Sequence, residues 1–238
     1  MSVYVITGVS RGIGFEFVKQ FSEDSNNLIV GLVRDKATTE KKVAAELGDR
    51  SNVHILHADL TNYASLKQAA ADTAEIVGER GIDYLVANGG IVPYLDGFGP
   101  IGALYVYFPL VTVWFVANAD LDFTNEVGID IGSLYAASKA AMNIIVAKFS
   151  VQYKSDGVLF MAISPGVVEV GHYSDITPQE TEGLMAFVGK LAAYAPHFKG
   201  PISTEESVRA VSSVWEKASI ENGDGGTFVS HLGNKQWV

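Results

Sequence analysis

A tyrosine and a lysine stand four positions apart in the segment SLYAASKAAMN, residues 133–143, as Tyr135 and Lys139. Residues with this spacing lie on one face of a helix, so both side chains can reach a single small target. A phenol has a pKa of about 10, and a nearby ammonium group favours its ionised form, as a general acid or base requires. The spacing also suits an ordinary amphipathic helix with a half-buried tyrosine and a solvated lysine.

A glycine-rich segment, TGVSRGIG at residues 7–14, follows the first predicted strand and precedes a predicted helix. Gly8, Gly12 and Gly14 permit a tight turn and let backbone N–H groups approach a phosphate, which the helix N-terminus also attracts. The order GxxxGxG differs from the general GxGxxG fingerprint, and a glycine-rich loop without a ligand is the alternative. On the first strand of an alternating pattern, the segment favours dinucleotide binding.

Short apolar runs rich in β-branched residues alternate with helical patterns through most of the chain. This alternation predicts an α/β fold with a doubly wound parallel sheet, in a single domain spanning residues 1–238. Ser203 with Glu206 and Thr177 with Glu180 form predicted capping boxes. The predicted strands are Val3–Thr7, Leu28–Val33, Val53–Ala58, Tyr84–Ala87, Val111–Ala117, Val158–Ser164 and Thr227–Ser230. The predicted helices are residues 13–22, 38–48, 62–79, 134–154, 178–194 and 204–218.

The composition excludes several classes of protein. A chain of 238 residues that is 48% hydrophobic is typical of a globular protein with a sizeable core. Its net charge of −10, without a basic block, argues against nucleic acid as a partner. Because it has no cysteine, it has neither a disulfide framework nor a thiolate metal site, which fits a reducing compartment. The five histidines show no metal-ligand spacing, so we predict no metal.

Residues 97–119 carry no charge and are long enough to span a bilayer. Their glycines and prolines, and the acidic flanks Asp96 and Asp120, argue instead for a buried strand with its loop. The N-terminal MSVYVITG enters a strand without a signal-like segment. We therefore predict a cytoplasmic protein without a membrane partner.

Five motifs occur in an order that resembles one known family. The chain is similar to the classical short-chain dehydrogenase/reductases over nearly its whole length, and most of all to small fungal ketoreductases. This resemblance implies a Rossmann-type fold, a nicotinamide dinucleotide, a small carbonyl or alcohol substrate and a homo-oligomer. The motifs are TGVSRGIG, ADL at 58–60, ANGG at 87–90, YAASK at 135–139 and SPG at 164–166.

The resemblance also implies roles for single residues. Tyr135 would protonate the carbonyl oxygen, while Lys139 would bind the nicotinamide ribose and lower the tyrosine's pKa. Asp59 would accept a hydrogen bond from the adenine, although it equally suits capping a helix that begins at Thr61, and Asn88 equally suits a turn. The implied cofactor-binding residues are Gly8, Ser10, Arg11, Gly12, Ile13, Gly14, Arg34, Asp59, Leu60, Asn88, Gly89, Tyr135, Lys139, Pro165, Gly166 and Val168.

The choice between NADP and NAD depends on the residues after the second strand. An acidic residue there would bind a free ribose 2′-hydroxyl, whereas arginine accommodates a 2′-phosphate. The chain offers Arg34 followed by Asp35, with Arg11 in the glycine turn. Two guanidinium groups can pair with one phosphate, so we favour NADP over NAD, although each arginine also suits a solvated surface.

Several expected groups are missing near the nicotinamide end. No serine occurs between Val111 and Ser133, where the family's pattern has one that binds the substrate carbonyl. Asn118 and Thr124 are the candidate replacements, and each also suits a structural role. Val170 stands where a threonine is expected after the SPG motif.

The segment before the catalytic helix is also short, because only 47 positions separate Asn88 from Tyr135. Three explanations stay open: a reductase with substituted donors, a deletion variant that keeps the fold, or a fault in the sequence through 97–119. The function predicted first is an NADP-dependent oxidoreductase that transfers a hydride between nicotinamide and a ketone, aldehyde or alcohol. The alternative is a dinucleotide-binding protein without redox turnover.

Residues 167–198 are predicted to form a flexible segment that covers the substrate. Their aromatic and apolar side chains favour an apolar or aromatic carbonyl compound, but an amphipathic helix needs the same residues for packing. These side chains are Tyr173, Met185, Phe187, Tyr194 and Phe198.

Overall fold

The computed structural model describes residues 1–90, 120–130, 132–171 and 178–237. The chain forms two compact units, Met1–Gly90 and Ile91–Val238. The predicted strand Val111–Ala117, the capping residue Thr177 and the candidate Asn118 lie outside the described residues.

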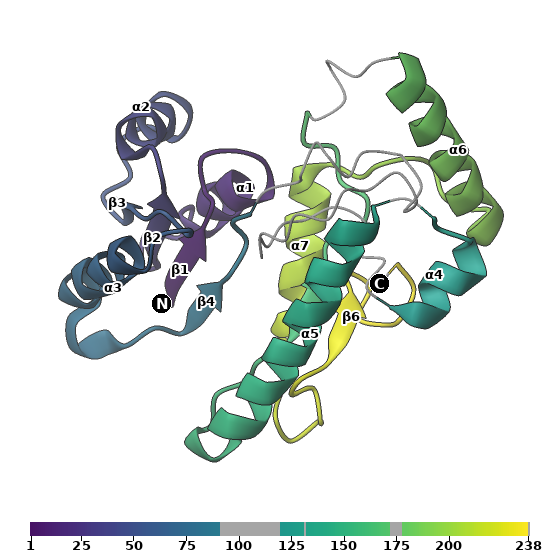
Figure 1. Ribbon diagram of the computed structural model, residues 1–238. Coiled ribbons are helices and arrows are strands. Elements are labelled where there is room, and N and C mark those ends of the chain that lie inside the picture. Colours follow the sequence, from purple (N-terminus) through teal and green to yellow (C-terminus); the bar gives the residue numbers. More distant parts are fainter. Residues whose placement is uncertain (91–119, 131, 172–177, 238) are drawn as a thin grey trace. The chain divides into compact units, whose positions relative to one another are not determined.

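The first unit contains a parallel sheet of four strands in the order β3-β2-β1-β4 (Figure 1). Apolar residues predominate in these strands, and all six residues of β2 are buried. In the register, Val3 of β1 pairs with Leu28 of β2, and Tyr4 pairs with Tyr84 of β4. The strands are β1 (Val3–Thr7), β2 (Leu28–Val33), β3 (Val53–His57) and β4 (Tyr84–Val86).

Three helices connect these strands and cover both faces of the sheet. They are α1 (Gly12–Phe21), α2 (Lys36–Leu47) and α3 (Tyr63–Val77), the last followed by a 3-10 turn at Gly78–Arg80. Figure 1 shows α3 on one side of the sheet and α1 and α2 on the other. Alternate strand residues point to opposite faces. On the α3 face the buried cluster is Val3, Val5, Leu28, Val30, Leu32, Leu56, Ala58, Ala69 and Val77.

Side chains cap the helices that start after β2 and β3. The Asp35 carboxylate accepts a hydrogen bond from the Thr38 N–H at 3.0 Å, and Asn62 Oδ1 accepts one from the Ala64 N–H at 3.0 Å. Each bond satisfies one of the N–H groups that a helix start leaves without an intrahelical partner. Asn62 is thus the N-cap of α3, so the predicted alternative in which Asp59 caps a helix at Thr61 is wrong.

The second unit contains four helices and a pair of parallel strands among its described residues. Phe123, Phe187, Leu191 and Trp237 are buried in one apolar cluster, which joins α4 to α6. The elements are α4 (Leu121–Val127), α5 (Ser133–Tyr153), a 3-10 turn (Lys154–Asp156), β5 (Ala162–Ser164), α6 (Pro178–Tyr194), α7 (Thr204–Trp215) and β6 (Phe228–Ser230).

The parallel strands and intervening helices confirm the predicted α/β class. The boundaries of β1 and β2 are those predicted, and the capping box of Ser203 and Glu206 starts α7. β5 is shorter than predicted, because only Ala162–Ser164 pair with β6. The helix α4 was not predicted, although Asp120 signals its start by accepting hydrogen bonds from the N–H groups of Asp122 and Phe123.

In the part of the chain that the structure describes, every helix is too short or too polar to cross a membrane. The uncharged stretch at 97–119 lies outside that part.

Candidate functional site

The glycine turn between β1 and α1 packs directly on the end of β4. Gly8 has a φ of +72°, and a Cβ atom there would lie 2.5 Å from the Cα of Gly89. A Cβ on Gly14 would collide with the carbonyl oxygen of Gly8 and lie 2.5 Å from Asn88 Nδ2. Since neither position has room for a side chain, both glycines are required by the fold of this turn, and Gly12 at φ +58° completes it.

Asn88 holds this turn from the end of β4. Its buried side-chain amide donates a hydrogen bond to the Thr7 carbonyl at 2.9 Å, and the Gly89 N–H donates one to Thr7 Oγ1 at 2.7 Å. The Gly8 N–H donates to the Leu32 carbonyl at 2.8 Å. Asn88 was predicted to line the cofactor or to occupy a turn, and the observed bonds give it a bracing role in the turn.

Asp59 and Leu60, the predicted adenine contacts, follow β3. Asp59 Oδ1 accepts hydrogen bonds from the N–H and the hydroxyl of Thr61 at 2.9 and 2.8 Å. These bonds hold the pKa of Asp59 below its ordinary value, and the charges of Arg34 and His57 lower it further. The Leu60 side chain is 39% exposed, and a Cβ on Gly89 would lie 2.8 Å from its Cδ1. The structure therefore places Leu60 beside Gly89, which packs on the glycine turn.

Arg11 and Arg34 are both exposed near the carboxyl ends of β1 and β2. The two strands pair as far as Thr7 and Leu32, so the residues that follow them emerge at one edge of the sheet. Asp35 caps α2, and this hydrogen bond holds the pKa of its carboxyl below the ordinary value. Arg11 precedes α1, and its side chain makes no capping hydrogen bond to that helix.

Tyr135 and Lys139 lie on one face of α5 in the second unit, as their spacing predicted. Tyr135 is buried, and Lys139 Nζ lies 5.5 Å from the centre of the Tyr135 ring. Burial lowers the pKa of Lys139 to about 8. The Ser138 hydroxyl donates a hydrogen bond to the Tyr135 carbonyl at 2.7 Å, so the Ser138 side chain is engaged with its own helix. The helix thus brings a buried phenol and a partly desolvated ammonium group together.

The SPG motif begins at the last residue of β5, and hydrogen bonds from Ser207 and Ile202 hold this part of the chain. The buried Ser207 hydroxyl of α7 donates a hydrogen bond to the Pro165 carbonyl at 2.9 Å. Val168 is buried and bridges to Ile202, whose N–H donates to the Val167 carbonyl at 2.8 Å. These bonds fix the start of the predicted substrate-covering segment in place.

His231 supports Gly166 from the end of β6. Gly166 has a φ of +85°, and a Cβ there would lie 2.7 Å from Cε1 of the His231 ring. Among the described residues, the buried atoms Ser164 Oγ and His231 Nδ1 have no hydrogen-bond partner. Burial lowers the pKa of His231. The sequence predicted no role for Ser207 or His231, because each acts on a residue more than forty positions away.

Thr124 and Asn118 were the predicted replacements for the missing serine, and the structure describes Thr124. Thr124 lies half-buried in α4, where its carbonyl accepts hydrogen bonds from the N–H groups of Gly128 and Ile129. Asn118 lies outside the described residues, and Val170 is half-buried.

Most of the aromatic side chains predicted near the substrate pack inside the second unit. Tyr194 contacts Phe123 and Trp237, with ring centres 5.3 and 5.7 Å away, and Phe198 packs on Trp237 at 5.4 Å. Phe187 is buried in the same cluster, while Met185 is 66% exposed. The packing alternative therefore accounts for Phe187, Tyr194 and Phe198, and Tyr173 lies outside the described residues.

The chain has relatives of known family over its whole length. It is 56% identical over 272 aligned residues to the short-chain dehydrogenase/reductase iacC of Pestalotiopsis fici, with 100% of both chains covered. The chain belongs to the short-chain dehydrogenase/reductase family. The short chain dehydrogenase virK of Hypocrea virens is 47% identical over 272 residues, again covering 100% of both chains. This enzyme is therefore an oxidoreductase, and its predicted likeness to fungal members is confirmed.

The sequence model of this family, described as short chain dehydrogenase, matches residues 2–103 of the oxidoreductase, which include the glycine turn. Its fold resembles that of an NADPH-bound carbonyl reductase from chicken fatty liver, with a TM-score of 0.73, 19% identity and 98% of each chain covered. The alignment to iacC is 34 positions longer than the 238 residues of this dehydrogenase/reductase. At least 34 aligned positions of iacC therefore have no counterpart in this chain.

Proposed function

We propose that this protein is an NADP-dependent oxidoreductase that transfers a hydride between nicotinamide and a ketone, aldehyde or alcohol. The observation that carries the proposal is the pair of Tyr135 and Lys139 on one face of α5. Tyr135 is buried and Lys139 has a pKa lowered to about 8, so both groups differ from solvated surface residues. Such perturbed groups are typical of catalytic sites.

The first unit fits a dinucleotide phosphate. The glycine turn has no space for side chains at residues 8 and 14. These residues therefore place no side chain over the N–H groups at the start of α1. No side-chain cap from Arg11 satisfies the N–H groups of that start, and a helix N-terminus favours an anion. We assign the pyrophosphate to Gly8–Gly14 and the adenine to Asp59 and Leu60.

The second unit carries the residues proposed for the nicotinamide half. When bound, the nicotinamide supplies or accepts the hydride at the substrate carbon. In the reducing direction, the Tyr135 hydroxyl donates its proton to the carbonyl oxygen, so the carbonyl becomes an alcohol. The ammonium of Lys139 favours the tyrosinate that remains and binds the ribose hydroxyls. We propose that this half of the nucleotide lies against Pro165, Gly166 and Val168.

Charge supports NADP over NAD. Arg11 and Arg34 are exposed at the edge where β1 and β2 end, whereas the Asp35 carboxylate is engaged in capping α2. We therefore expect a 2′-phosphate to pair with the two guanidinium groups, whereas the bond to Thr38 already engages one oxygen of the carboxylate that would accept from a free 2′-hydroxyl.

The remaining features of this proposal come from the resemblance and the composition. We propose that the substrate is a small apolar or aromatic carbonyl compound, that the two units belong to one dinucleotide-binding domain, and that the protein works as a homo-oligomer in the cytoplasm.

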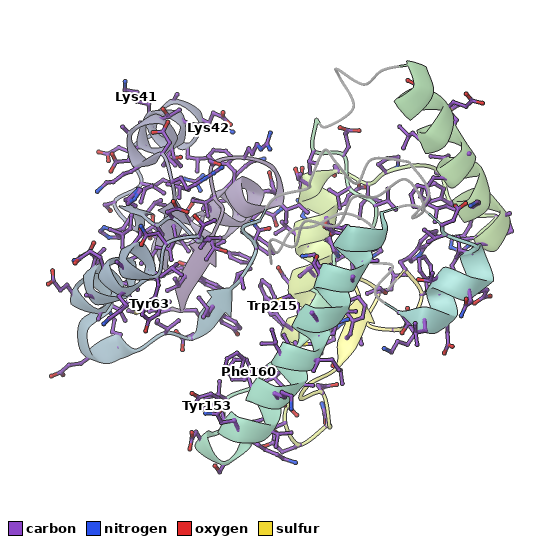
Figure 2. The ribbon with its side chains drawn as sticks, viewed as in Figure 1. Lys41, Lys42, Tyr63, Tyr153, Phe160 and Trp215 are labelled. Atoms are coloured by element: carbon purple, nitrogen blue, oxygen red, sulfur yellow. The ribbon has the colours of Figure 1, made fainter. Side chains whose placement is uncertain are left out.

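The test combines nucleotide binding with turnover. Calorimetric titration of the protein, after its intact mass is confirmed, should give micromolar affinity for NADPH and weaker affinity for NADH. Tyr135→Phe should keep NADPH binding and abolish NADPH oxidation with a panel of ketones and aldehydes. The matched control is Tyr153→Phe on the same helix, where the ring packs on Phe160 at 5.7 Å (Figure 2). Full turnover in Tyr135→Phe, or no binding of either nucleotide by the parent protein, would contradict the proposal.

A further inference from the structure

Lys42 reaches from α2 to the glycine turn. Its ammonium Nζ lies 3.3 Å from the Ser10 carbonyl oxygen and 4.2 Å from the centre of the Phe15 ring. Ser10 is in the turn, and Phe15 is a buried residue of α1. A lysine stem can cover an apolar ring while its charged end keeps a polar partner, and a cation over an aromatic face is attracted to it. Lys42 therefore connects α2 to the glycine turn and to α1.

The contact with Ser10 determines the direction of the next N–H group. The Ser10 carbonyl and the Arg11 N–H belong to one peptide unit, and the described residues contain no cis peptide bond. In a planar trans unit the carbonyl and the N–H point in opposite directions. An ammonium that binds the Ser10 carbonyl thus keeps the Arg11 N–H pointing away from α2. This N–H immediately precedes the start of α1, where we place the pyrophosphate.

The neighbouring Lys41 lacks these contacts. It is exposed, and its charge is a minor cause of the lowered pKa of Asp35. Figure 2 shows Lys41 and Lys42 on α2, and the ring contact with Phe15 places Lys42 on the side of the helix that faces α1. The two lysines carry the same charge one residue apart, so Lys41 is the control for charge, while Lys42 Nζ also lies 3.9 Å from Glu46 Oε1 on the same helix.

We infer that Lys42 is a positioning residue for the dinucleotide site: by binding the Ser10 carbonyl and covering Phe15, it orients the backbone N–H of Arg11, in the glycine turn, toward a phosphate. This inference rests on the proposed function for its effect on nucleotide affinity. Because the pyrophosphate is common to both nucleotides, Lys42 acts equally on NADPH and NADH. A direct contact with the 2′-phosphate would act on NADPH alone.

The first arm of the test measures nucleotide affinity by calorimetry in Lys42→Met, Lys42→Arg and Lys41→Met. Loss of one hydrogen bond to the turn should weaken NADPH and NADH by the same factor, about threefold to tenfold. Lys42→Arg should recover most of this loss, and Lys41→Met should bind like the parent protein at an ionic strength that screens surface charges. A loss confined to NADPH, an equal loss in Lys41→Met, or no loss in Lys42→Met would overturn the inference.

The second arm needs no nucleotide. Amide hydrogen exchange of the peptide covering residues 8–15 should be faster in Lys42→Met than in the parent protein and unchanged in Lys41→Met. If the parent protein binds neither nucleotide, the proposed function fails while this comparison still decides whether Lys42 holds the turn. Unchanged exchange in Lys42→Met would overturn the positioning role by itself.

Discussion

The Cα atom of Gly89 occupies the space that a side chain on Gly8 would need. A Cβ on Gly8 would approach it to 2.5 Å, well inside van der Waals contact. The turn after β1 and the end of β4 therefore pack backbone against backbone, 81 positions apart in the sequence. The same two segments exchange the hydrogen bonds of Asn88 and Gly89 with Thr7. The glycine turn is thus part of the packing of its own unit.

Gly8→Ala should destabilise the protein far more than Gly128→Ala. Both glycines have nearly the same φ, +72° and +70°, but nothing lies within 4 Å of a Cβ on Gly128. An alanine at this φ costs about 1–2 kcal/mol, and only at residue 8 does a backbone collision add to it, for a total of roughly 3 kcal/mol or more. Urea unfolding of the two variants measures the difference. Equal losses would mean that the turn can move away from Gly89.

Lys139→Met should stabilise the protein at pH 7 while abolishing turnover. Burial lowers the pKa of Lys139 from its ordinary 10.5 to about 8, so the unfolded chain holds the proton more tightly than the folded chain. The free energy of unfolding therefore rises with pH between about 8 and 10.5, and at pH 7 the charged lysine still destabilises the folded chain. Removing the charge should raise the free energy of unfolding at pH 7 by about 1–3 kcal/mol.

The control for this variant is Lys148→Met, because Lys148 is exposed on the same helix. It should change the free energy of unfolding by less than about 0.5 kcal/mol. Urea unfolding at pH 7 and pH 10 would contradict the prediction if Lys139→Met were less stable than the parent protein at pH 7. A stabilised but inactive Lys139→Met would mean that the lysine is present for chemistry, at a cost in stability.

Arg34→Leu should weaken NADPH binding about tenfold or more and leave NADH binding nearly unchanged, since a hydrogen bond to a charged group contributes about 1.5–3 kcal/mol. Only NADPH carries the 2′-phosphate that Arg34 is proposed to bind. The control is Arg80→Leu, since Arg80 precedes β4 and so lies at the opposite edge of the sheet. Calorimetric titration with both nucleotides measures the ratio of affinities. An equal loss for NADPH and NADH in Arg34→Leu would remove the basis for preferring NADP.

Local sequence predicted the elements of the fold because their signals are short-range. The apolar runs of β1 and β2 gave the observed boundaries, and Ser203 with Glu206 form the predicted capping box. The i,i+4 spacing likewise placed Tyr135 and Lys139 on one face of α5. Each of these features depends on residues within a few positions of one another.

The features that sequence reasoning missed depend on local competition or on distant contacts. Asp59 accepts a hydrogen bond from the Thr61 N–H in a turn, whereas Asn62 accepts from the N–H groups of Ala64 and Ser65 and so caps α3; short polar side chains favour both arrangements, and the sequence does not say which residue takes which. Ser207 and Lys42 act on carbonyls 42 and 32 positions away. The lowered pKa of Lys139 needs the burial of the folded chain, which its sequence spacing does not contain.

His231 should make the protein less stable in weak acid. Burial lowers its pKa below the ordinary 6.5, so the unfolded chain binds a proton that the folded chain resists. The stability that neutral His231 allows is therefore complete above pH 6.5 and is lost as the pH falls below that value. His231→Phe keeps a ring beside Gly166 but cannot bind a proton, so its unfolding temperature should fall less between pH 7 and pH 5. His197→Phe, at an exposed site, should retain the dependence of the parent protein, and an unchanged slope in His231→Phe would show that this ring is not the group that titrates.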